Sequence, residues 1–158
     1  MSVLIKTQGQ KKAVWAVFDL RIEGELCDLG VMQIRSRSLA AHLAGCKRVI
    51  LLATTLGAAF DRELQKQARL SPARAYELQM QGLREIEAWC DTLCAELAKE
   101  QCATLRARFS PGYGDLSLEV QREIFRVLEP AKHIGLCLSE SCVMIPSKSV
   151  TAFVGVEK

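Results

Sequence analysis

The segment at residues 106–115 combines the residue types in this chain that best suit ligand binding. It reads Arg-Ala-Arg-Phe-Ser-Pro-Gly-Tyr-Gly-Asp, and an exposed strand is expected to end at Arg108 before the Pro-Gly pair turns the backbone. Gly112 allows free backbone amides to approach a ligand closely. Arg108, Ser110 and Tyr113 add a guanidinium, a hydroxyl and an aromatic ring within six residues. This combination suits a small zwitterionic or carboxylate ligand; the alternative is a plain surface turn between a strand and a helix.

Glu87 is the second candidate. It lies three or four residues from Leu83 and Cys90, so it borders the apolar side of a long predicted helix. A carboxylate at such a position is seldom fully buried without a partner. Two roles follow: a structural ion pair with an arginine, or a contact to an amine or hydroxyl of a ligand.

The third candidate is a polar cluster formed by Ser139, Glu140 and Ser141 beside an apolar run, which is either a binding edge or a hairpin turn. Neither His42 nor His133 stands near a Ser or Cys in a recognisable nucleophile setting. The sequence has no phosphate-binding loop, dinucleotide fingerprint or HExxH motif. Hydrolase chemistry therefore has no support, and no catalytic residue is assigned.

Seven cysteines are the remaining groups with possible metal or redox chemistry. They are Cys27, Cys46, Cys90, Cys94, Cys102, Cys137 and Cys142. No CxxC pair occurs, and zinc needs about four closely set Cys or His ligands. Because free cysteine is among the most buried residue types, we expect reduced thiols in the core and no metal. A metal or redox site is the alternative.

The length of 158 residues predicts a single domain over residues 1–158. The composition, 49% hydrophobic and 25% charged, is that of a globular protein. The net charge of +3 is spread along the chain, with a basic cluster only at residues 106–108, so nucleic-acid binding is not expected. Without a secretory signal or an apolar run of 18 residues, the chain is expected to be cytoplasmic and without a membrane span.

Apolar patterning predicts an α+β fold, in which a mixed or antiparallel sheet packs with a long central helix and shorter helices. The run at 48–54 is continuously apolar, as in a strand buried on both faces. The longest helix begins with Ser71 as N-cap and Pro72 in its first turn, and Pro130 is expected to stop the last helix. The expected strands are 13–20, 22–34, 48–54, 133–138 and 149–156, and the expected helices are 36–43, 58–69, 72–100 and 117–128.

Three motifs follow one another in a fixed order along the chain. They are Glu-Ala-Trp at 87–89, Arg-Phe-Ser-Pro-Gly-Tyr at 108–113, and Leu-Ser-Glu-Ser-Cys-Val-Met-Ile-Pro at 138–146, with Ser-Val at 149–150. Together they resemble the activation domain of cobalamin-dependent methionine synthase, which has a Glu-Ala-aromatic helix, an Arg-x-x-Pro-Gly-Tyr turn and a Thr-Glu-Ser segment ahead of a Pro and a Ser-Val pair. The resemblance is closest to short, stand-alone members of that family.

The resemblance implies S-adenosylmethionine binding and support for the reductive methylation of cob(II)alamin in methionine synthase or a related corrinoid methyltransferase. By position, Arg108 would hold the methionyl carboxylate, and Glu87 an amine or hydroxyl of the ligand. Ser110, Gly112 and Tyr113 would contact the adenosyl part, largely through the backbone. Cobalamin (vitamin B12) would be carried by a partner, either the cobalamin-binding modules of methionine synthase or another corrinoid protein, with a flavodoxin-type electron donor. The chain is not expected to act without that partner.

Glu119, Ser139, Glu140 and Ser141 are expected at the interface with this partner. Glu119 takes the position of a histidine that touches the cobalamin module in the long enzymes. Two ligand contacts of the family, an acidic residue near the N-terminus and a tyrosine near the C-terminus, have no counterpart here, and a homodimer is one way to complete the site. The rival function is a scaffold that docks on a corrinoid protein without using S-adenosylmethionine.

Overall fold

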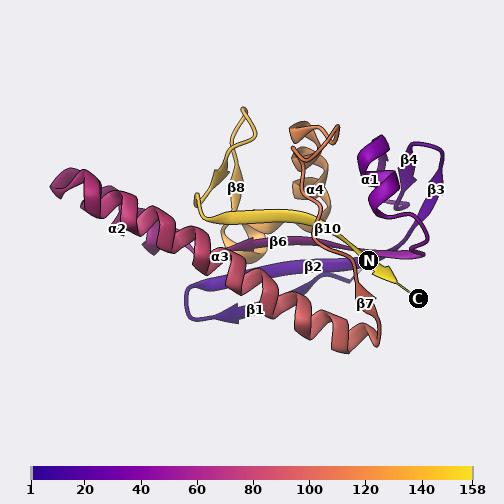
Figure 1. The fold of residues 1–158 in the computed structure, drawn as a ribbon, viewed down its shortest axis with the longest axis horizontal. Helices are drawn as coiled ribbons and strands as arrows, with labels where there is room; N and C mark the ends of the chain where they lie inside the picture. Colours follow the sequence, from indigo (N-terminus) through magenta and orange to yellow (C-terminus); the bar gives the residue numbers. More distant parts are fainter. Residues whose placement is uncertain (1, 158) are drawn as a thin grey trace.

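A five-stranded antiparallel sheet forms the centre of the computed structural model, which describes residues 2–157 (Figure 1). In spatial order the strands are β1 (Leu4–Gln8), β2 (Lys11–Asp19), β6 (Arg48–Thr55), β10 (Ser149–Glu157) and β7 (Thr104–Leu105). Each neighbouring pair runs antiparallel. The predicted α+β class is confirmed, and of the two sheet types considered the antiparallel one is present.

The central strand β6 is buried on both faces, as its unbroken apolar sequence predicts. Residues 49–55 are all buried. Alternate side chains point to opposite faces of a strand, so Leu52 joins one core cluster and Leu51 the other. The sheet therefore separates two hydrophobic cores.

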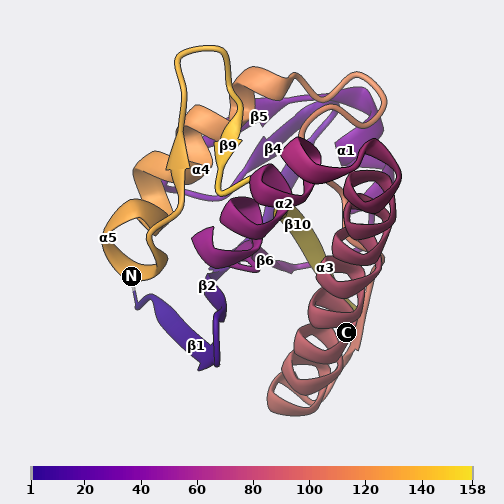
Figure 2. The same ribbon diagram turned by 90° about the vertical axis from the view of Figure 1, so that its left-hand side faces the viewer.

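Helix α3 (Pro72–Gln101) covers one face of the sheet (Figures 1 and 2). Its apolar stripe includes Ile86, Trp89 and Leu93, which pack in the same cluster as Leu52. Ser71 caps the helix by accepting a hydrogen bond from the Arg74 backbone N–H at 3.4 Å. The preceding helix α2 (Ala58–Leu70) packs on α3 and buries no residue of its own.

Shorter elements cover the opposite face (Figure 2). The helices are α1 (Arg37–His42), α4 (Gln121–Leu128), which follows a 3-10 turn η1 (Leu118–Val120), and α5 (Pro130–Ile134). A small meander contains β3 (Arg21–Glu23), β4 (Leu26–Asp28) and β5 (Gln33–Arg35), and a hairpin contains β8 (Cys137–Leu138) and β9 (Met144–Ile145).

Two predicted strands are wrong in detail. The stretch 22–34 is not one strand, because Gly24 and Gly30 adopt positive φ and turn the chain into the meander. The stretch 133–138 begins in a helix, since Pro130, expected only to end α4, also starts α5. Only β8 at its end is extended.

Two further differences lie at the sheet edges. Strand β1, which the sequence did not suggest, pairs with β2 and is exposed along most of its length. The strand expected to end at Arg108 is only the two-residue β7, after which Phe109 forms an isolated bridge with Phe153. Arg108 thus lies in an irregular segment beside the sheet.

All seven cysteines are free thiols. Four of them are buried, Cys94 is half-buried, and Cys102 and Cys137 are exposed. Within residues 2–157, no group of three His, Cys, Asp or Glu side chains is placed to hold a metal ion. No helix in this part of the chain has the length and apolar character needed to cross a bilayer.

Candidate functional site

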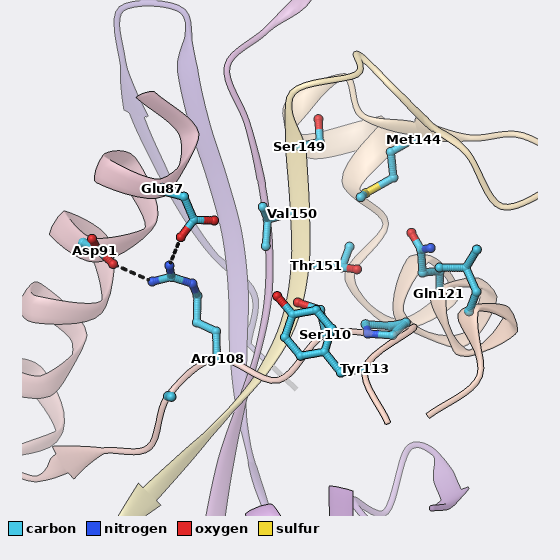
Figure 3. Close-up of a pocket in the computed structure, with 13 residues that line it drawn as sticks. Glu87, Asp91, Arg108, Ser110, Tyr113, Gln121, Met144, Ser149, Val150 and Thr151 are labelled. Carbon is cyan, nitrogen blue, oxygen red and sulfur yellow. Dashed lines mark hydrogen bonds and ion pairs between the residues drawn. The ribbon is translucent and has the colours of Figure 1, made fainter. Parts of the chain in front are cut away.

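A pocket of about 560 Å³ opens between helix α3, the segment 107–113 and the start of β10 (Figure 3). Glu87 and Asp91 of α3 stand with Arg108 on one side of it. Gln121, the first residue of α4, stands on the other side with Met144 of the hairpin. Its volume lies within the range of small-molecule sites.

The guanidinium of Arg108 lies between the two carboxylates of α3. Its Nη2 donates to Glu87 Oε2 at 2.8 Å and its Nη1 to Asp91 Oδ1 at 3.0 Å (Figure 3). Burial alone lowers the pKa of Arg108, but the hydrogen bonds to Asp91 and to the Cys94 Sγ outweigh it, so this pKa lies above its ordinary value. The Arg108 side chain is 18% exposed, whereas Glu87 and Asp91 are 63% and 73% exposed. The site therefore combines a fixed cation with two accessible anions.

The helix itself explains why two carboxylates meet one guanidinium. Glu87 and Asp91 are four residues apart, so they lie one above the other on one face of α3. Between and below them, Ile86, Cys90 and Leu93 are buried against the sheet. The apolar stripe of α3 thus fixes the direction in which the carboxylates point.

The turn at 110–116 is held by its own backbone. Gly112 adopts φ +99°, and its N–H donates to Leu116 O at 2.8 Å, while the Tyr113 N–H donates to Ser110 O at 3.0 Å. The expectation that these two amides are free for a ligand is wrong, because the turn uses them. What the turn offers instead is the Tyr113 ring, which is exposed and packs edge-on against Phe109 at 5.6 Å.

Asp115 anchors the end of this turn to helix α1. Its carboxylate accepts hydrogen bonds from the Ser36 hydroxyl at 2.6 Å and from the backbone N–H groups of Arg37 and Ser38, both at 3.0 Å. The hydrogen bond from Ser36 and those from the Ser38 and Arg37 amides hold the pKa of Asp115 well below its ordinary value. The turn is thus tied to an element on the far side of the sheet from α3.

The segment before the turn is anchored as well. Arg106 donates to the carbonyl oxygens of His42 at 2.7 Å and Ala44 at 2.9 Å, and it pairs with Glu157 of β10. The His42 ring lies 2.7 Å from Ala107 O. These contacts hold the backbone next to Arg108 in place, so the starting position of its side chain is fixed.

Four of the five residues assigned to ligand binding from the sequence line this pocket: Glu87, Arg108, Ser110 and Tyr113. Gly112 shapes the turn but does not line the pocket. Of the two roles considered for Glu87, the ion pair with an arginine is present.

The residues expected at a partner interface lie outside the pocket. Ser139, Glu140 and Ser141 form the turn between β8 and β9, which is the hairpin alternative; the Ser139 hydroxyl lies 3.1 Å from the Ser141 hydroxyl. Arg122 donates to Glu119 Oε2 at 2.8 Å and also to the Glu140 backbone carbonyl. One arginine therefore brings Glu119 and this turn to the same surface.

Sequence reasoning missed three kinds of pocket residue. Asp91 had a usable signal, since it follows Glu87 by one helical turn. Met144 lies in the motif at 138–146 but was not assigned to the ligand, and Gln121 had no signal, because only the packing of α4 and the hairpin brings it to the pocket. Val150 and Thr151 reach the pocket from β10, in the Ser-Val motif and directly after it.

No protein-family model and no curated protein matches the sequence. Among solved structures, the fold is similar to that of the MetH reactivation domain bound to AdoHcy, that is, S-adenosylhomocysteine. The TM-score is 0.72 and the sequence identity is 16%. The match covers 92% of this chain and 58% of the solved one, so the chain spans little more than half the length of that domain.

Proposed function

We propose that this chain, which has the fold of the MetH reactivation domain, binds S-adenosylmethionine and S-adenosylhomocysteine in the pocket beside α3. In this role it is an accessory protein that supports the reductive methylation of a corrinoid held by a partner. The observation that carries the proposal is the meeting of Arg108, Glu87 and Asp91 at one pocket wall.

These three side chains suit the amino-acid end of such a ligand. An α-carboxylate fits the guanidinium of Arg108, and an α-ammonium group fits the exposed carboxylates of Glu87 and Asp91. The Nε–H of Arg108 has no acceptor within residues 2–157, so one donor is available without breaking either ion pair. A zwitterionic ligand can therefore bind these three side chains without breaking the ion pairs between them.

The other parts of the pocket suit the nucleoside end. The exposed Tyr113 ring offers an aromatic surface in the pocket, and Val150 adds an apolar side chain to its lining. Purine rings stack on such surfaces, and base–aromatic stacking contributes about 1–3 kcal/mol per base. The polar and aromatic halves of the pocket thus correspond to the two halves of the ligand.

The chemistry proposed needs positioning rather than acid or base catalysis. A corrinoid held by the partner and reduced by a flavodoxin-type donor would supply the nucleophile for the methyl group, and S-adenosylhomocysteine would leave with the C–S electron pair on its sulfur. Arg108 and the α3 carboxylates hold the amino-acid end, and the turn at 110–116 limits where the methyl group can point. No proton is transferred in this step, so the proposal needs no acid or base among the residues that line the pocket.

A second candidate is the scaffold that docks on a corrinoid protein without using S-adenosylmethionine. The observation that favours it is that two of the three guanidinium nitrogens of Arg108 already donate hydrogen bonds to Glu87 and Asp91. Under this hypothesis the clamp, that is, Arg108 held between Glu87 and Asp91, is purely structural. The surface joined by Arg122, with Glu119 and the turn at 139–141, would be the docking surface.

Isothermal titration tests the proposal directly. The wild-type protein is titrated with S-adenosylmethionine, S-adenosylhomocysteine and 5′-methylthioadenosine, which lacks the amino-acid end. Arg108→Ala is compared with Arg84→Ala, an exposed arginine on the same helix as Glu87. We expect one-site binding of the first two ligands, much weaker binding of the third, and loss of binding in Arg108→Ala alone.

Ligand binding by the wild type, measured together with docking on the partner, separates the two candidates. Pull-down on a cobalamin-binding methionine synthase module should retain Arg108→Ala under either hypothesis. An absence of S-adenosyl ligand binding by the wild type up to about 1 mM, a free energy weaker than about −4 kcal/mol, together with retained docking would favour the scaffold.

A further inference from the structure

Gln121 is a buried polar side chain of the pocket wall, and its amide has an unpartnered atom. The residue is 3% exposed. Its Nε2 donates to the Cys142 backbone carbonyl at 3.4 Å, while its Oε1 has no hydrogen-bond partner within residues 2–157. Buried polar atoms are nearly always paired, and an unpaired one is costly. A donor group that reached this oxygen from the pocket would satisfy it.

The orientation of this amide is fixed by its neighbour. A backbone carbonyl only accepts hydrogen bonds, so the nitrogen of the amide must face Cys142. Turning the amide over would bring two oxygens together and leave both without a donor. The group that Gln121 offers is therefore an acceptor and not a donor.

The acceptor lies at the end of the pocket away from the charged clamp. Figure 3 shows Gln121 across the pocket from Arg108 and Glu87, with its amide oxygen on the pocket side of its nitrogen. Tyr113 and Met144 line the same pocket. A ligand whose charged end meets Arg108 therefore brings its opposite end toward Gln121.

We propose that Oε1 of Gln121 accepts a hydrogen bond from the exocyclic amine of the adenine ring and so selects adenosyl over 6-keto purine ligands. This inference rests on the proposed function, since it assigns the far end of the same ligand. An amine satisfies the buried oxygen of Gln121. A keto oxygen at the same place would put two acceptor oxygens next to each other. The hydrogen bond to Cys142 prevents the amide from rotating to offer its N–H instead.

The test combines a change in the protein with a change in the ligand. Gln121→Met keeps the length of the side chain and removes the acceptor, and Gln81→Met, on the exposed side of α3, is the matched control. Each protein is titrated with S-adenosylhomocysteine and with S-inosylhomocysteine, in which a carbonyl oxygen replaces the amine. Thermal unfolding without ligand confirms that each variant is folded.

We expect wild type and Gln81→Met to prefer the adenosyl ligand by at least about tenfold, the effect of one satisfied against one unsatisfied buried group. In Gln121→Met the preference should narrow to within about threefold, mainly through weaker binding of the adenosyl ligand. This coupling between residue and amine supports the assignment, because a general loss of affinity leaves the ratio unchanged.

Three outcomes overturn it, and they differ from one another. If the wild type binds both ligands equally, or if Gln121→Met keeps the wild-type preference, Gln121 does not read the amine although the proposed function stands. Equal binding by the wild type decides the matter even if the variant fails to fold. If the wild type binds neither ligand, the proposed function fails and the inference fails with it.

Discussion

Neutralising Glu87 tests whether the clamp on Arg108 also receives the ligand. In Glu87→Gln the side chain keeps its shape and loses its charge. Arg108 keeps its second partner, Asp91, at 3.0 Å. We expect helix α3 to keep its position, because Ile86 and Cys90 of its apolar stripe remain buried. The substitution therefore separates a ligand contact from a structural one.

The structure sets the size of both effects. The Glu87 side chain is 63% exposed, so its attraction for a ligand ammonium group is largely screened. About 1–2 kcal/mol remains, or roughly 5–30-fold in Kd. The lost pair with Arg108 joins a largely buried guanidinium to an exposed carboxylate, and because Glu87 is screened by solvent it contributes about 0–1 kcal/mol. For a chain of this length that lowers Tm by at most about 4 °C.

Titration calorimetry with S-adenosylhomocysteine and with its desamino analogue measures the first effect, and scanning calorimetry measures the second. Glu87→Gln should weaken binding of the first ligand and leave the desamino analogue unaffected. Glu100→Gln, an exposed carboxylate near the end of α3, should change neither. A Kd within twofold of wild type, or an equal loss for both ligands, would refute the view that Glu87 binds the ammonium group.

Two further substitutions test the turn, and a labelling experiment tests the thiols. Gly112→Ala places a side chain at φ +99°, where the left-handed backbone costs about 1–2 kcal/mol, so calorimetry should show a fall in Tm of roughly 2–8 °C; an unchanged Tm would mean that the turn relaxes freely. Asp115 has a lowered pKa, so its stabilising effect is complete above its ordinary value of 3.8 and is lost as pH falls toward the pKa of the folded state. The Tm difference between wild type and Asp115→Asn should therefore be largest above about pH 4 and shrink below it, and a difference independent of pH contradicts this. Burial raises the pKa of the Cys94 thiol, although its hydrogen bond to Arg108 opposes the rise, so iodoacetamide at pH 7.5 should label the exposed Cys102 well before Cys94 in a mass-spectrometric time course. Equal rates would show a stabilised thiolate at Cys94.

The sequence predicts the elements whose signals are local. Between Arg48 and Thr54 the run has no polar residue, so a doubly buried strand follows from it directly. Ser71 and Pro72 mark the start of α3 to the residue, because capping depends only on neighbours in the chain. The Pro-Gly-Tyr turn and Glu87 were singled out for the same reason, as unusual residue types at short spacing.

What the sequence could not show depends on contacts between distant segments. Strand β1 has little apolar pattern of its own and exists through pairing with β2. Gln121 looks like an ordinary helix residue until α4 packs against the hairpin and buries it. The amides of the turn are not free for a similar reason, because the backbone oxygens of Leu116 and Ser110 accept hydrogen bonds from them.

The distribution of rigidity around the pocket connects the fold with the proposed chemistry. On one side, the buried stripe of α3 fixes the carboxylates; on the other, Asp115 ties the turn to α1, and Arg106 ties the preceding backbone to the loop after α1. The charged groups are thus in place before any ligand arrives, and little ordering entropy remains to be lost on binding. A methyl transfer without proton transfer gains most from such placement, since its rate depends on holding the sulfonium carbon in line with the attacking atom. A site built for proton transfer instead needs a group that titrates near neutral pH within reach of the substrate. The pocket wall offers a fixed cation, two carboxylates and an amide acceptor, which together can orient a ligand and leave the reacting centre to a partner.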